Sequence, residues 1–219
     1  MNERSVAGPA VDDARAALIE AMAHSCMERG YLATEIDHLL AATGLSRAEF
    51  DSHFDGKEAC AVAAVEAVLA AVVRIMGELY SPDRSEVESY LLGIRGILEL
   101  MSREPAFAHV SFVAARQMSP PVLKGVLESG SDLLAAMLDR LREYAPAKDQ
   151  PPRAARAALG GAEAVVRREI ALGTTDDLGR LLPDFIYAAT VPFLGQREAL
   201  RFAREAVRIL EEAADPPLS

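Results

Sequence analysis

Helical periodicity runs through almost the whole chain, and this feature limits the possible folds more than any other. Apolar residues recur at spacings of three and four, and most glycines and prolines fall between the periodic segments. Alanine and leucine carry the apolar content, aromatic residues make up only 5%, and tryptophan is absent. Because alanine and leucine favour helix over strand, the sequence predicts an all-α protein.

Capping residues and helix breakers divide the chain into successive helices. A first helix over about 13–29 is closed by Gly30, and two short helices follow on either side of the turn at 43–45. The second short helix opens on the capping box at 46–49, and a similar box at 55–58 opens a long helix to about residue 80. Later helices are expected over about 85–102, 105–118, 121–144, 153–171, 176–194 and 196–213, with a proline-rich loop over 145–152. The helix over 176–194 is expected to be interrupted near Pro183 and Pro192.

Composition excludes several classes of protein. With 51% hydrophobic residues the chain can bury a core, but its net charge of −10 argues against binding nucleic acid through bulk charge. With only Cys26 and Cys60, neither a disulfide framework nor a four-ligand zinc site is expected, and no cofactor or metal is predicted. The longest apolar run, 59–73, contains Glu66 and is short for a membrane span. Since the N-terminus does not have the pattern of a signal peptide, we expect a cytoplasmic protein with no membrane partner.

Catalytic signatures are missing from the sequence. It contains neither a P-loop nor a glycine-rich dinucleotide fingerprint. His24 and Cys26 are two residues apart on a helix and point to different faces, and the same holds for His109 and Ser111. The protein is therefore predicted not to be an enzyme.

Residues 11–57 have the ingredients of a helix-turn-helix, namely a short helix, a glycine turn and a second, capped short helix. In such a motif the second helix presents its N-terminal residues to base edges, while the flanking helices contact phosphates. Residues 58–214 would form a larger second domain, and the long helix from 56 joins the two parts.

Particular residues add weight to this pattern, because they stand in the order and spacing of the N-terminal signature of the TetR/AcrR family. They are Gly30-Tyr31, Thr34, Ile36, Gly44-Leu45-Ser46, Phe50, His53-Phe54 and Lys57-Glu58. The sequence resembles this family over about the first 60 residues. A looser resemblance, to actinobacterial members in particular, follows at 105–108, 160–162 and 192–195.

The resemblance implies a fold and a function. TetR-like proteins are all-helical homodimers, in which an N-terminal three-helix module binds a palindromic DNA operator. A second domain, here of six to seven helices, encloses a pocket for a small-molecule effector that releases the operator. We therefore expect a ligand-responsive transcriptional regulator, and a repressor, as most members are.

Five residues are the candidates for contact with DNA. Arg47 is expected at a base or a phosphate and Lys57 at a phosphate, with Thr34, Ser46 and His53 as lesser candidates. Each has a simpler alternative. Thr34 and Ser46 would serve as N-caps, and His53 and Lys57 as ordinary surface residues.

The module also departs from the family pattern. Glu35 replaces a phosphate-contacting threonine, Asp51 replaces a tyrosine that bonds the DNA backbone, Leu40 replaces a small alanine, and Cys26 replaces a phenylalanine. Residues 11–60 contain four basic and ten acidic residues, an excess of six negative charges in a module that should meet a polyanion.

These departures leave three interpretations open. Glu49 either caps its helix or accepts a hydrogen bond from a cytosine amino group. Asp51 either faces a phosphate or pairs with Arg47, four residues earlier, which would neutralise both side chains and remove Arg47 from DNA. Finally, the module either binds DNA or has kept only its fold, so that the protein binds a small molecule or a partner instead.

In the larger domain, candidate ligand and interface residues follow from helical position. The pocket candidates are Tyr90, Met101, Phe107, His109, Phe112, Arg116 and Met137. The dimer-interface candidates are Leu159, Ala162, Val166, Ile170, Phe202 and Val207. The alternative in both cases is that these side chains form the core of a single chain, with Arg116 capping its helix.

Overall fold

The structure is a computed structural model that describes residues 11–79, 81, 83–119, 121, 125, 132, 135–136, 138 and 154–214. All regular elements in these ranges are helical, which confirms the prediction of an all-α fold. They are α1 (Val11–Arg29), α2 (Ile36–Thr43), α3 (Arg47–His53), α4 (Lys57–Leu79), α5 (Glu86–Arg103), α6 (Pro105–Phe112), η1 (Ala114–Gln117), α8 (Ala154–Leu172), η3 (Leu178–Leu181) and α9 (Leu182–Ala214).

Most of the predicted helix bounds are reproduced to within a few residues, and two differ for local reasons. The helix expected over 105–118 ends at Phe112 and continues as the short 3₁₀ turn η1. The helix expected over 176–194 begins only after η3, runs through Pro192, and kinks at Gly195, where φ is 73°. Most of the helix expected over 121–144, and the whole loop over 145–152, lie outside the described residues.

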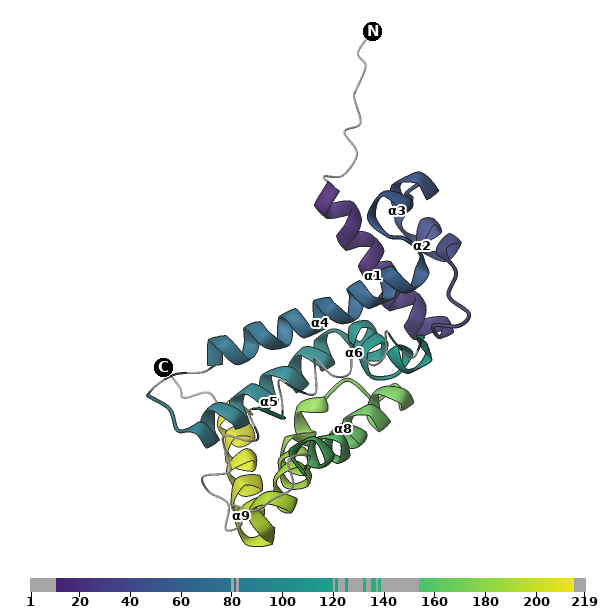
Figure 1. The fold of residues 1–219 in the computed structure, drawn as a ribbon. Coiled ribbons are helices and arrows are strands. Elements are labelled where there is room, and N and C mark those ends of the chain that lie inside the picture. The colour runs from purple at the N-terminus through teal and green to yellow at the C-terminus, as the bar shows by residue number, and fades with distance from the viewer. Residues whose placement is uncertain are drawn as a thin grey trace.

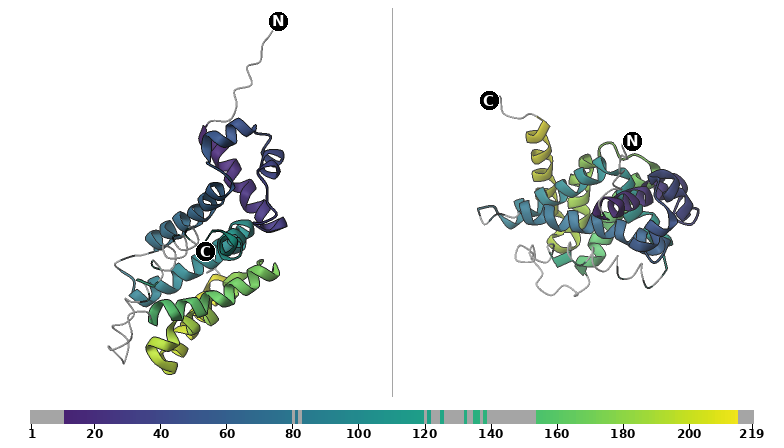
Figure 2. Two further views of the ribbon diagram at one scale, coloured as in Figure 1. Left: turned by 45° about the vertical axis from the view of Figure 1, so that its right-hand side comes forward. Right: turned by 90° about the horizontal axis from the view of Figure 1, so that it is seen from above.

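The helices form two groups that α4 joins (Figure 1). Helices α1, α2 and α3 lie together at one end of the molecule, and α4 leads away from them alongside α5. Helices α8 and α9 pack against each other on the far side of α5, and the rotated views keep this arrangement (Figure 2).

Two apolar clusters hold these groups together. The first, which we call the N-terminal core, takes Leu18, Met22 and Phe50 from α1 and α3, residues 60–65 from α4, and apolar residues from α6 and η1. The second, the larger core, takes Val68, Val72 and Met76 from α4 together with residues of α5, α8 and α9. Helix α4 therefore belongs to both cores, and no linker separates the two groups along it.

Both cysteines lie in the N-terminal core, each with no measurable exposure. Burial raises the pKa of Cys26 above its ordinary value and raises that of Cys60 to about 12. The thiols therefore stay protonated near neutral pH and act as small apolar side chains.

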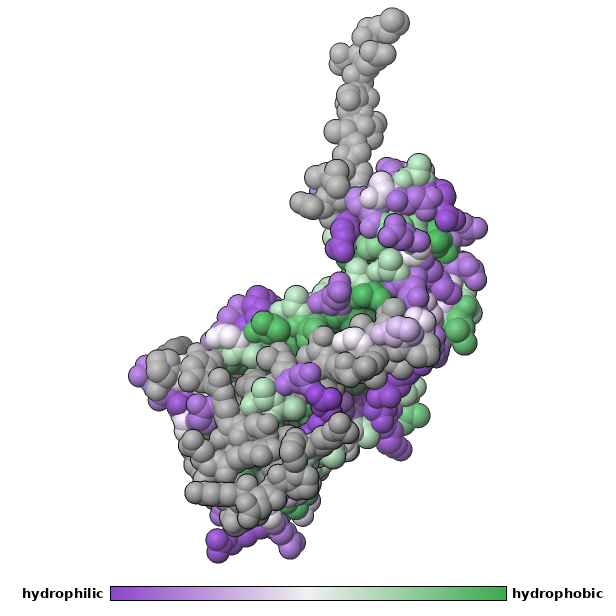
Figure 3. Space-filling view, in the orientation of Figure 1, coloured by the Kyte–Doolittle hydropathy of each residue, from purple (hydrophilic) through white to green (hydrophobic). Residues whose placement is uncertain are grey.

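Helix α4 is long and apolar enough to cross a membrane by length and composition alone. In the structure 44% of this apolar window is buried, and α4 packs against α1, α5 and α6. Figure 3 shows part of its apolar surface as a strip across the middle of the molecule, below the mainly polar α1–α3 group.

Helices α4 and α5 approach closely at two glycines of α5. A Cβ atom added at Gly96 would lie 2.8 Å from Cγ2 of Ile75, and one at Gly93 would meet Cε of Met76. The branched side chain of Ile75 has little freedom to move aside. Gly77 of α4, in contrast, has no atom within 4 Å of the added Cβ.

We predict that Gly96→Ala makes the protein about 1–3 kcal/mol less stable than Gly77→Ala does. Both substitutions gain the same helix propensity, so the difference isolates the steric strain at Ile75. Urea unfolding followed by circular dichroism measures it. Equal stabilities of the two variants would show that α4 and α5 do not approach as closely as described.

Candidate functional site

The turn between α2 and α3 is built by residues near to one another in sequence. Gly44 adopts the left-handed conformation, with φ of 72°, and its N–H donates to the carbonyl of Leu40 to close α2. Ser46 caps α3, and its hydroxyl and backbone N–H donate to Oε2 of Glu49 at 2.6 and 2.7 Å. These hydrogen bonds lower the pKa of Glu49, and they confirm the predicted capping box. Ser46 and Glu49 therefore both serve to start α3.

Phe50 fixes the orientation of α3. Its ring is fully buried in the N-terminal core, with its centroid 5.7 Å from that of Phe54. With Phe50 pointing inward, the other residues of α3 up to Ser52 are exposed, Arg47 and Asp51 among them. This exposed side is the surface that a recognition helix would present to DNA.

Arg47 and Asp51 form an ion pair on that exposed side. The Nε–H of Arg47 donates to both carboxylate oxygens of Asp51, at 2.9 and 3.1 Å. The two side chains are 60% and 52% exposed. Of the two interpretations of Asp51, the structure therefore shows the pairing with Arg47.

Lys57 has a structural role that its sequence position did not reveal. Its ammonium group donates to the carbonyls of Thr34 at 2.8 Å, Tyr31 at 3.1 Å and Leu32 at 3.4 Å. It also lies 4.7 Å from the centre of the Tyr31 ring. Because its ammonium group donates to three carbonyl groups, Lys57 links the start of α4 to the loop before α2. The predicted phosphate contact by Lys57 is inconsistent with this geometry.

Thr34 is likewise an internal residue. Its side chain has no measurable exposure, and its hydroxyl donates to the carbonyl of Gly30 at 2.9 Å. The hydroxyl of Ser25 lies 3.1 Å from that of Thr34 and completes the buried pair. The predicted DNA contact by Thr34 is therefore corrected, because its side chain faces the N-terminal core. It is also not the N-cap of α2, a position that Glu35 occupies.

Glu35, Leu40 and the DNA-contact candidate His53 lie in different environments. The backbone N–H of Glu35 donates to Nδ1 of His38 at 3.0 Å, and Glu35 itself is exposed. Leu40 is partly buried against the N-terminal core. His53 is half-buried, with its ring centroid 6.4 Å from that of Phe54.

The other two basic residues of this module also have partners within it. Arg15 lies over the Phe54 ring, 5.2 Å from its centroid, and Arg29 pairs with Glu28 at 3.5 Å. Together with Arg47 and Lys57, all four basic residues of 11–60 therefore contact groups of this chain. The module offers little unpaired positive charge to a polyanion.

Helix α6 and η1 connect this module to the rest of the protein. Glu58 accepts a hydrogen bond from the backbone N–H of Ser119 at 2.7 Å, which lowers the pKa of Glu58. Phe107 packs against both the N-terminal core and the larger core. Any shift of α6 would therefore reach both groups of helices.

The ligand candidates occupy different environments. Tyr90 and Met101 are each only 2% exposed in the larger core, Phe107, His109 and Phe112 are partly buried, and Arg116 is exposed. Met137 lies outside the described residues.

Several polar atoms near these candidates are buried with no hydrogen-bond partner in the described part of the chain. They are Ser89 Oγ, Tyr90 Oη, His109 Nδ1 and Ser111 Oγ. Burial raises the pKa of Tyr90 and lowers that of His109. A buried polar atom without a partner costs about 1–3 kcal/mol, which a bound ligand that supplies the hydrogen bond would recover.

Glu163 is a further polar residue that the sequence reasoning missed. It lies on α8, where burial raises its pKa and the charges of Arg116 and Arg167 act in the opposite direction. The sequence did contain a signal, because Glu163 falls beside the apolar stripe of Leu159 and Val166.

The predicted dimer interface is wrong for five of its six residues. Leu159, Ala162, Val166, Ile170 and Phe202 are each at most 3% exposed and belong to the larger core of one chain, so they are not available to a second chain. Of these six residues, only Val207 is exposed, at 40%. Leu200, two helical turns earlier on α9, is exposed to the same degree.

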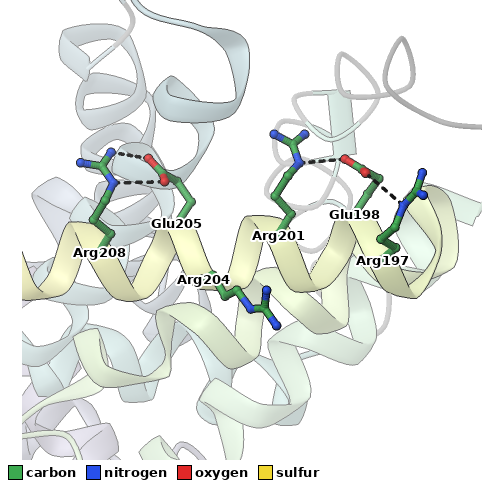
Figure 4. A pocket seen from close by; sticks show the side chains of 6 residues that line it. All are labelled: Arg197, Glu198, Arg201, Arg204, Glu205 and Arg208. Carbon is green, nitrogen blue, oxygen red and sulfur yellow. Dashed lines mark hydrogen bonds and ion pairs between the residues drawn. The ribbon is translucent and has the colours of Figure 1, made fainter.

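Charged residues flank this exposed part of α9 (Figure 4). Arg201 pairs with Glu198 at 2.8 Å, and Arg208 pairs with Glu205, along a shallow hollow that Arg197 and Arg204 also line. Figure 4 shows Arg204 directed away from these ion pairs.

No protein-family model matches the chain, and no curated protein matches it significantly in sequence. Its structure, however, is similar to several solved structures. TylP, a TetR regulator from Streptomyces fradiae, is 18% identical, with a TM-score of 0.68 over 93% of this chain and 99% of TylP. A gamma-butyrolactone receptor described as ArpA-like is 21% identical, with a TM-score of 0.66 over 93% and 100%. FadR from Bacillus subtilis, solved with stearoyl-CoA, is 17% identical, with a TM-score of 0.68 over 82% and 98%.

The match over nearly the full length of these structures establishes that the chain has the TetR-like fold.

We predict that Lys57→Met lowers the free energy of unfolding by about 1.5–3 kcal/mol, because it leaves three carbonyl groups without a charged donor. Arg74→Met on the same helix is the matched control. Arg74 pairs only with Glu78 on the surface, and such a pair contributes about 0–1 kcal/mol. Denaturant unfolding of both variants provides the comparison. A loss no larger than that of the control would contradict the structural role of Lys57.

Proposed function

We propose that this protein is a ligand-responsive transcriptional regulator of the cytoplasm that binds a palindromic operator as a homodimer and represses transcription. The observation that carries the proposal is the position of Arg47. It is exposed at the first turn of α3, where a recognition helix presents its residues to bases. The TetR-like fold supports the same conclusion.

The proposed effector is mainly apolar and carries hydrogen-bonding groups. Its site would lie among the helices of the larger core, close to Tyr90 and Met101 of α5 and Phe112 of α6. The hydroxyl of Tyr90 and Nδ1 of His109 are the buried polar atoms that would orient it. Two of the similar solved structures are a gamma-butyrolactone receptor and a regulator bound to stearoyl-CoA, so the fold accommodates such molecules.

Helix α6 would carry the response from the effector to the operator. An effector beside His109 or Phe112 contacts α6 directly, and Phe107 of the same helix reaches the N-terminal core. The hydrogen bond from Ser119 to Glu58 ties the end of η1 to the start of α4. A shift of α6 would therefore move α1–α3 as a unit and change the spacing of two modules in a dimer.

The exposed face of α9 is the proposed dimer contact. Leu200, Arg204, Val207 and Glu211 follow one another at spacings of four, three and four, and all are exposed. A second copy running antiparallel would set Leu200 of one chain against Val207 of the other. The same pairing brings Arg197 of one chain beside Glu211 of the other, while the two Arg204 side chains lie near each other at its centre.

We predict that Val207→Glu converts the dimer to a monomer, because it places a carboxylate at the centre of this apolar contact. Leu172→Glu is the control, since Leu172 is 61% exposed at the end of α8, outside the proposed contact. Sedimentation velocity gives the oligomeric state. A Val207→Glu protein that remains dimeric would place the interface elsewhere.

A second candidate function is supported by the charge of the module. Residues 11–60 hold an excess of six negative charges, and their four basic residues contact groups within the chain. A protein of this fold that no longer binds an operator, and instead binds a small molecule or a partner, fits these facts.

Selection of random DNA fragments by the purified protein, at low and then physiological salt, separates the two candidates. We predict enrichment of one palindrome, with an affinity that falls as salt rises and that falls about tenfold or more in Arg47→Ala. If no sequence is enriched by folded, dimeric protein even at low salt, operator binding is refuted and the second function stands.

A further inference from the structure

The Arg47–Asp51 pair leaves the outer edge of the guanidinium open. Asp51 accepts only from Nε of Arg47, at 2.9 and 3.1 Å. In the described parts of the chain, no hydrogen bond reaches Nη1 or Nη2 of Arg47. The guanidinium carbon also lies 6.0 Å from the centre of the Phe50 ring, so the side chain lies along the surface of α3.

The open edge has the chemistry that recognises guanine. Two parallel N–H donors of a guanidinium match O6 and N7, the two acceptors that guanine alone presents side by side in the major groove. A free arginine side chain must lose its rotamer freedom to form this contact. Asp51 already restricts Arg47 in this structure, so less freedom remains to be lost on binding.

We infer that Asp51 is a positioning residue, which directs the Nη edge of Arg47 to a guanine in each operator half-site. The inference rests on the proposed function, and it identifies the base that the module reads. It also accounts for the carboxylate at this position. Its charge is balanced by Arg47, and the pair as a whole neither attracts nor repels a phosphate strongly.

The other basic residues of the module already contact groups of this chain. Lys57 is occupied by three carbonyl groups, and Arg15 and Arg29 lie against Phe54 and Glu28. Attraction to the DNA backbone is therefore weak in this module, and base contacts must supply a larger share of the selectivity.

The test compares DNA selection by the unaltered protein with that by Asp51→Ala, Asp51→Asn and Arg47→Lys. Asp37→Ala is the matched control, because it removes one exposed carboxylate from the same module at a residue that does not contact Arg47. The Arg47–Asp51 pair is exposed, so its loss should leave the fold intact, and circular dichroism checks this.

In Asp51→Ala we expect the preference for guanine at one position of each half-site to fall about tenfold. Total affinity for DNA should hold or rise, and its salt dependence should steepen, because the released Arg47 can now contact phosphates. Asp51→Asn, which keeps an acceptor oxygen, should lose less of the preference. Arg47→Lys should lose the preference while keeping the charge, and Asp37→Ala should keep it.

Two outcomes would overturn the inference, and they are distinguishable. If the unaltered protein selects a palindrome and Asp51→Ala keeps the same guanine preference, Asp51 does not position Arg47, while the proposed function survives. If the unaltered protein selects no sequence, both the inference and operator binding are refuted.

Discussion

The N-terminal core is the constraint on which the rest of this structure depends. Its apolar residues come from α1, α3 and the start of α4, but also from α6 and η1, which follow more than forty residues later in the chain. Because α6 and η1 help to bury Met22 and Phe50, the helix-turn-helix does not have a core of its own. Its position is set by the same helices that border the larger core, so a displacement of α6 would disturb the packing of both cores.

The basic residues of the module differ in their partners from those of a protein that binds DNA through charge. Its basic residues contact groups of the same chain, carbonyl groups in the case of Lys57 and the exposed carboxylate of Asp51 in the case of Arg47. Such internal contacts stabilise the fold but reduce the charge available to phosphates. A module of this kind would bind weakly to DNA in general and depend on a few well-placed base contacts.

Features set by neighbouring residues were predicted well from the sequence. The capping box of Ser46 and Glu49 and the turn at Gly44 need only residues within a few positions of one another, and the pairing of Asp51 with Arg47 needs only one helical turn. Features set by distant residues were not. The three acceptors of Lys57 lie more than twenty residues away, and the burial of Thr34 depends on Ser25 in the preceding helix.

The sequence by itself determined the helices, their order, and the helix-turn-helix, because periodicity, caps and turns are local properties of the chain. Only the tertiary structure decided which face of each helix is buried. The stripe from Leu159 to Ile170 has the same spacing whether it meets a second chain or α9 of its own chain, and the structure assigns it to the larger core. The tertiary structure also decided that Lys57 binds carbonyl groups of a distant loop, while Arg47 stays at the surface. The partners of a charged side chain depend on which distant segments pack against it.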